Sequence, residues 1–271
     1  MSFEILPPTD DWIFKLLFGD ERNKSMLIDM LTSFIELPQE EYELTFLDTY
    51  LKKEFEEDKY GIVDIKVKTK SGKILHIEIQ INPVADIGER LSFYKSKLIV
   101  EQIGEGQRYN VIQKVICICI LSYELFPDVP DYINDFRYYN IKNQLLFKAI
   151  PEEIYTLELS KLPVASDGSE LYDWLQFLKS NTKEDLEMVA ERNPEIRKAV
   201  NTLYELSADA RVRAEYEARQ KALRDRASQL GSAFDEGHEK GRMEVAQRLK
   251  DMGLSAEQIL AATGIKQEKI P

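Results

Sequence analysis

The chain has 271 residues, 44% of them hydrophobic and 31% charged, and is long enough to bury a substantial core. This composition excludes a disordered chain, and no run of about eighteen apolar residues predicts a transmembrane helix. The net charge of −12 argues against a surface that attracts nucleic acid everywhere, but it is compatible with a local basic cleft. The two cysteines form one C-x-C and no basic, apolar leader opens the chain. We therefore expect a cytoplasmic protein without a disulfide framework and without a membrane partner.

The first half of the chain alternates between helical and extended patterns. Apolar residues recur at helical spacing over residues 10–36, with an interruption near Gly19, and the residues that follow alternate as strands do. The continuous apolar run at 111–121 is typical of a strand buried on both faces. The predicted order is helix, three strands, helix and strand, over residues 10–36, 44–51, 61–69, 73–81, 86–104 and 111–121.

The second half is predicted to end in helices. Weak strands are expected at 136–141 and 155–159, short helices follow residue 166, and a helix of some forty residues, roughly 60 Å long, reaches toward Lys250. Tyr216, Leu223 and Leu230 lie seven residues apart, which predicts weak pairing with a partner helix and hence a homodimer. We expect an α/β domain over 1–165 and a helical extension over 166–271, ending in a short tail that resembles a helix-turn-helix but lacks a basic recognition face.

Residues 61–81 predict a β-hairpin whose loop is Lys70-Ser71-Gly72. In that register Asp64 lies opposite Glu78, and Gln80 points to the same side as Glu78. Two opposed carboxylates repel each other, and a hard divalent cation such as Mg²⁺ between them would relieve the repulsion. The other reading is a solvated sheet face with neighbouring charges and no metal.

Several segments together are similar to one known family. They are Asp11–Gly19, Ile62–Ile65, Ile77–Gln80, Arg90–Tyr94, Leu157–Pro163, Ala218–Lys221 and Met252–Ile259. They resemble the Rpn-type recombination-promoting nucleases, also described as PD-(D/E)xK nuclease family transposases. The resemblance implies a restriction-endonuclease-like mixed sheet flanked by helices. It also implies a DNA endonuclease that depends on Mg²⁺ or another divalent cation and is linked to recombination or transposition.

By position, the resemblance implies that Asp64 and Glu78 hold the metal. Gln80 then occupies the place of a lysine in the wider superfamily, so the cation beside the attacking water is missing. Lys15, Lys66 or a second metal could replace that cation, and the sequence does not choose among them. Asp11 is either a further acidic group of the site or the N-cap of its helix.

Helical spacing places Arg90 and Tyr94 where they could hold a phosphate, as Lys66 on the neighbouring strand also could. The plain alternative is a helix surface, with Tyr94 partly buried. His76 shares the face of the carboxylates, as a proton relay or as an ordinary polar strand residue. A catalytically inactive nuclease fold that binds DNA or protein and assembles through its C-terminal helix is the alternative function.

Overall fold

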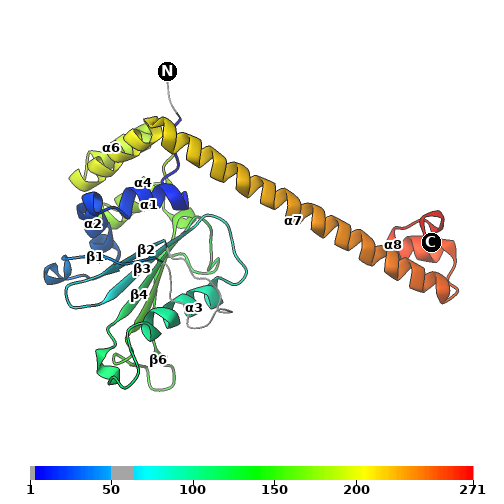
Figure 1. The fold of residues 1–271 in the computed structure, drawn as a ribbon, viewed down its shortest axis with the longest axis horizontal. Helices are drawn as coiled ribbons and strands as arrows, with labels where there is room; N and C mark the ends of the chain where they lie inside the picture. Colours follow the sequence, from blue (N-terminus) through cyan, green and yellow to red (C-terminus); the bar gives the residue numbers. More distant parts are fainter. Residues whose placement is uncertain (1–3, 50–63, 271) are drawn as a thin grey trace. The chain divides into compact units, whose positions relative to one another are not determined.

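The computed structural model describes residues 4–49 and 64–270 (Figure 1). The parts of the predicted strands that fall on residues 50, 51 and 61–63 lie outside the described residues. The chain forms two compact units, one ending at Asp209 and the other beginning at Ala210. The first unit contains two of the hydrophobic clusters and the second unit contains another.

The first unit combines strands and short helices in the predicted order. The helices are α1 (Asp11–Phe18), α2 (Lys24–Phe34), α3 (Ile87–Val100), α4 (Glu170–Lys179), α5 (Lys183–Ala190) and α6 (Pro194–Ala208). The strands are β1 (Thr45–Phe46), β2 (Ile65–Lys68), β3 (Ile74–Gln80), β4 (Val115–Leu121), β5 (Ile133–Phe136), β6 (Tyr139–Asn140), β7 (Leu145–Leu146) and β8 (Glu152–Glu158). The order of α1, β1, β2, β3, α3 and β4 confirms the order predicted for the first half of the chain.

Six strands form one mixed sheet in the order β1-β2-β3-β4-β8-β5. Strands β3, β4 and β8 are parallel, and the outer pairs are antiparallel. All of β4 is buried, as its continuous apolar run predicts. Helix α3 covers one face, and Figure 1 shows α1, α2 and α4 on the other. The α/β fold with a mixed sheet flanked by helices is therefore confirmed.

The β2–β3 hairpin has the register that the sequence predicts. Ile65 pairs with Ile77, and the loop closes with the amide of Thr69 donating to the carbonyl of Lys73. Gly72 has a φ of +96°, a left-handed conformation that favours glycine. The side chains of Ile65 and Ile77 are almost completely buried, so the predicted aliphatic face does point into the core.

Glu41 anchors the turn of this hairpin. Its carboxylate accepts a 3.1 Å hydrogen bond from the amide of Ser71 and lies 3.0 Å from Nζ of Lys73. Burial disfavours the charged form, but these hydrogen bonds and one from Thr69 outweigh it and lower the pKa of Glu41 to about 2. The charged carboxylate therefore stabilises the folded hairpin.

We expect Glu41→Gln to lower the free energy of unfolding by about 1.5–3 kcal/mol at pH 7, the range for hydrogen bonds to a charged group. Because the pKa is lowered from 4.5 in the unfolded chain to about 2, this stabilisation is full above pH 4.5 and is lost toward pH 2. Urea unfolding between pH 7 and pH 3 measures the difference. Glu43→Gln, whose carboxylate is exposed, is the control and should change little. A pH-independent difference would contradict the assignment.

Helices α4 to α6 pack into the first unit, although the sequence places them in the extension that begins at residue 166. Phe18 of α1 contacts Trp174 of α4 with ring centroids 5.8 Å apart. Asp29 of α2 accepts 2.8 Å hydrogen bonds from both Trp174 Nε1 and Asn193 Nδ2. These long-range contacts between α1, α2, α4 and the start of α6 join the helices into one core.

The second unit begins with α7 (Ala210–Asp251), a continuous helix of 42 residues. Gly231, Gly237 and Gly241 lie inside this helix and do not interrupt it. Helix α8 (Ala256–Thr263) folds back on its end, with a capping box formed by Ser255 and Gln258. Ala246 and three isoleucines form the small core between them.

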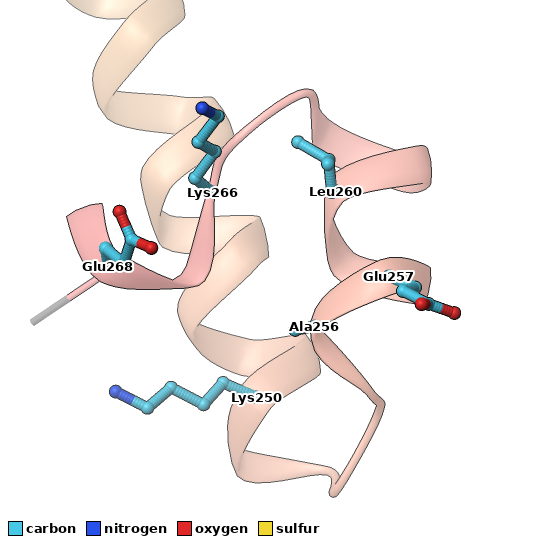
Figure 2. Close-up of a pocket in the computed structure, with 6 residues that line it drawn as sticks. All are labelled: Lys250, Ala256, Glu257, Leu260, Lys266 and Glu268. Carbon is cyan, nitrogen blue, oxygen red and sulfur yellow. The ribbon is translucent and has the colours of Figure 1, made fainter.

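A shallow pocket of about 610 Å³ lies at this end of the second unit (Figure 2). It is lined by Lys250, Ala256, Glu257, Leu260, Lys266 and Glu268. Two lysines and two glutamates are among these residues, and Figure 2 labels all four. The pocket therefore has no single sign of charge.

Candidate active site

Asp64 lies directly before β2, one step beyond the pair that joins Ile65 to Ile77. Its Oδ1 is 2.9 Å from Nζ of Lys15 on α1. Its Oδ2 accepts a 2.9 Å hydrogen bond from the amide of Ile79 on β3. Asp64 is thus fixed against the strand of Glu78, as the predicted hairpin register requires.

Glu78 points from β3 into the interior and is only 2% exposed. Oε1 accepts hydrogen bonds from Arg90 at 2.7 Å and from Gln80 at 3.2 Å. Oε2 lies 3.0 Å from Nε2 of His76. Three polar side chains, two from the same strand and one from α3, therefore surround a single buried carboxylate.

Helix α3 contributes Arg90 and Tyr94, which lie one turn apart on the face toward the sheet. The guanidinium of Arg90 is 5.0 Å from the centre of the Tyr94 ring, a cation–π geometry. The rings of Tyr94 and His76 lie nearly perpendicular to each other, with their centroids 5.8 Å apart. Tyr94 is 7% exposed, so its predicted burial is observed. Arg90 is not a plain surface residue, because it forms an ion pair with the buried Glu78.

The alternative prediction, a solvated sheet face with neighbouring charges, is wrong for the described residues. His76 is fully buried, and Lys66 and Glu78 are only 7% and 2% exposed. The reason is α3, which lies over this face and packs against β3 and β4. Cys117 and Cys119 are also buried on this face, where a free cysteine behaves as a small apolar residue.

The two carboxylates differ in their electrostatics. Burial raises the pKa of Asp64, and the negative charge of Glu78 raises it further against the opposing effect of Lys15. Burial acts in the same direction on Glu78, but the hydrogen bonds and charges of His76 and Arg90 outweigh it, so the pKa of Glu78 is lowered. Glu78 is therefore held as a carboxylate, whereas at Asp64 the ion pair with Lys15 does not outweigh burial and the charge of Glu78.

His76 is held between Glu78 and a cysteine. Burial alone would lower the pKa of His76, but interactions with Cys117 and Glu78 raise it to about 9. Nδ1 of His76 and Nε of Arg90 are buried without a hydrogen-bond partner among the described residues. The alternation of the strand already indicates the contact between His76 and Glu78, since residues two apart share a face.

The structure distinguishes the two lysines that the sequence leaves open. Lys15 forms an ion pair with Asp64, whereas Nζ of Lys66 is 2.8 Å from Oε2 of Glu101, just beyond α3. The sequence pattern gives no sign of Glu101, because the contact depends on how the end of α3 packs on β2. Lys66 thus has an acidic partner outside the pair of carboxylates.

Asp11 is exposed at the start of α1, one turn before Lys15. The N-cap of this helix is Asp10, whose side chain accepts hydrogen bonds from the amides of Trp12 and Ile13. The reading of Asp11 as the cap is therefore wrong by one residue. The cap needs extended backbone before the first helical turn, and Asp10 has it.

Asp64 and Glu78 are the carboxylates of this site that could hold a divalent cation. Within residues 4–49 and 64–270, no group of three or more histidine, cysteine, aspartate or glutamate side chains is arranged to hold a metal. Two carboxylates plus water and substrate phosphate are nevertheless the ligands that Mg²⁺ commonly takes. The carboxylate oxygens of Asp64 and Glu78 are donors that fit one hard cation, which would share them with Lys15, Arg90 and His76.

Comparison with known proteins identifies the family. A family model described as PD-(D/E)XK nuclease family transposase matches residues 8–233. The chain belongs to this family. The match contains all of the site described above and the first half of α7, and it supports a nuclease linked to transposition. Nucleases of this kind generally use divalent metals.

No curated protein and no solved structure matches the chain. Among the described helices of this nuclease-family chain, none is long and apolar enough to cross a membrane.

Proposed function

We propose that the chain is a Mg²⁺-dependent DNA endonuclease that acts in the cytoplasm and serves DNA recombination or transposition. The observation that carries the proposal is the pair of carboxylates formed by Asp64, directly before β2, and Glu78 on β3. Lys15 is paired with Asp64, and Arg90 is paired with Glu78. Family membership supports the nuclease reaction. The carboxylates would hold one divalent cation, which supplies a water of lowered pKa and balances charge on the phosphate.

The protein's own groups have separate tasks in this proposal. Lys15 supplies the positive charge beside Asp64 that the glutamine at position 80 cannot supply. Gln80 donates to Glu78 and orients it. Arg90, whose side chain is 36% exposed, reaches from Glu78 toward solvent and can bind a phosphate oxygen when substrate arrives. Tyr94 packs under the guanidinium and limits its rotation.

Nicking of supercoiled plasmid DNA with Mg²⁺ and with EDTA tests the function. The proposal expects conversion to open circles only with the metal, with products ending in 5′-phosphate and 3′-hydroxyl. If wild-type protein binds the plasmid but never nicks it under any divalent cation, the inactive nuclease fold that binds DNA or protein is the better description.

Thermal melts test metal binding without relying on cleavage. In EDTA at neutral pH we expect Asp64→Asn to be more stable than wild type by about 1 kcal/mol or less, the scale of a like-charge cross-strand pair. The sign follows because a carboxyl whose folded pKa is raised loses stability as pH rises from 3.8 through that raised value. Mg²⁺ should raise the melting temperature of wild type but not of the variant. Equal metal responses would contradict the site.

We also propose a weak homodimer through α7. Leu223 and Leu230 are 58% and 63% exposed on this helix and lie in one line with Tyr216. Such a short apolar seam predicts association that depends on concentration. We expect light scattering in the micromolar range to show a rising mass, and Leu230→Lys to reduce it. Met188→Lys, an exposed site on α5, is the control; a monomer at every concentration would contradict the seam.

A further inference from the structure

A small ribbon before β8 exposes most of its apolar side chains. It comprises residues 136–151 and contains β6 and β7, in which Tyr139 pairs with Leu146. The residues that share high exposure, between 42% and 87%, are Phe136, Tyr138, Tyr139, Ile141, Leu145 and Phe147. A stable monomer seldom leaves so many aromatic side chains in water over so short a segment without a binding role.

The ribbon is also basic in an acidic protein. Residues 136–151 contain Arg137, Lys142 and Lys148 and no aspartate or glutamate, so they carry +3 while the other residues carry −12 − 3 = −15. Arg137 is paired with Asp135 at 2.9 Å. Neither Lys142 nor Lys148 makes an ion pair with any residue of the described chain. The ribbon therefore offers two cations beside exposed aromatic rings.

We propose that the ribbon of residues 136–151 is a binding surface for single-stranded DNA. Unpaired bases stack on aromatic rings without regard to sequence, and lysines bind the phosphates between them. The ring of Tyr138 is already oriented, since its hydroxyl donates to Glu152 at 2.9 Å and Nζ of Lys95 lies 5.8 Å from its centre. A second copy of the ribbon is a poorer partner, because it would bring like charges together.

The surface is distinct from the carboxylate site but lies on the same side of the sheet. Tyr138 contacts Glu152 on β8, four residues before Thr156 on the same strand. Thr156 is level with Glu78 in the sheet, with β4 between their two strands. That separation is roughly 13 Å along the strands and roughly 10 Å across them. Helix α3 spans the interval, with Arg90 and Tyr94 near Glu78 and Lys95 near Tyr138. The inference relies on the proposed function only for DNA as the polymer.

Fluorescence anisotropy of a labelled single-stranded oligonucleotide, with an unlabelled duplex of the same sequence as competitor, tests the surface. The protein is the full chain carrying Asp64→Asn, in EDTA, so that cleavage plays no part. Adding Tyr139→Ser and Phe147→Ser should weaken single-strand binding about ten-fold or more. Adding Lys142→Ala and Lys148→Ala should reduce the slope of log affinity against log salt by about 1.4.

The matched control for the lysine pair is Lys179→Ala with Lys183→Ala. These exposed cations lie at the end of α4 and the start of α5, and their removal should leave affinity and slope unchanged. Circular dichroism checks that each variant is folded. If the aromatic double variant does not fold, the lysine double variant still decides the test. Unchanged binding in both ribbon variants, equal affinity for duplex, or a dimer that only the ribbon variants abolish would overturn the proposal. If wild-type protein fails to nick plasmid but still binds single-stranded DNA through the ribbon, the result counts against the proposed endonuclease and not against the binding surface.

Discussion

We expect Asp64→Asn and Glu78→Gln each to slow Mg²⁺-dependent plasmid nicking by about 100-fold or more. A divalent cation at a phosphoryl centre contributes several kcal/mol of charge stabilisation, and each 1.36 kcal/mol is about ten-fold in rate. Both substitutions keep the shape of the side chain and remove one anionic oxygen ligand. Because Asp64 and Glu78 are proposed to hold the same cation, the double variant should be little slower than either single one.

Neighbouring carboxylates provide the matched controls. Asp86→Asn and Glu89→Gln alter exposed acids at the start of α3, close in sequence to Arg90, and should nick at the wild-type rate. Circular dichroism should show the same helix content in all four variants. If Asp64→Asn nicks as fast as Asp86→Asn, the assignment of the metal-binding carboxylates is wrong, whatever the cause of cleavage.

We expect Lys161→Met to cause a large loss of stability. Glu158 at the end of β8 is completely buried, and its Oε2 lies 2.9 Å from Nζ of Lys161, whose side chain is 7% exposed. The same ammonium donates to the carbonyls of Phe126 and Val129 at 2.6 and 2.7 Å. Removing it leaves a buried carboxylate without its counter-charge and two carbonyls without their donor.

Breaking one side of a buried ion pair costs about 3–5 kcal/mol, and for a unit of this size we expect the melting temperature to fall by about 10 °C. Glu195 and Lys198 form the matched control, since they are also three residues apart and 2.7 Å from each other but on the surface. Lys198→Met should cost less than about 1 kcal/mol. Thermal and urea unfolding of both variants give the comparison, and equal losses would show that burial of the Glu158 pair does not matter.

The hairpin and the central strand could be predicted from the sequence because they depend on local pattern. Alternation with period two decides which side chains share a face, and a three-residue loop with glycine decides the register. Those two rules were enough to place Asp64 beside Glu78 and to make β4 a buried strand. The long helix α7 was predicted for the same reason, since its periodicity is local.

The alternation of apolar and polar residues could not decide whether the polar face of the hairpin is exposed to solvent or buried. His76, Glu78 and Lys66 would show the same pattern in both cases. The face is dry because α3 packs over it, and that depends on contacts between segments far apart in the chain.

Tertiary structure also decided which cation faces Asp64. Lys15 and Lys66 were equivalent in the sequence, since one lay on a helix of unknown position and the other on the neighbouring strand. Docking of α1 brings Lys15 to 2.9 Å from Asp64, and the end of α3 brings Glu101 to Lys66. Helices α4 to α6 joined the first unit for a similar reason, through the hydrogen bonds of Asp29. Local periodicity determines which residues lie side by side on one element, whereas the burial and charge around them come from long-range packing.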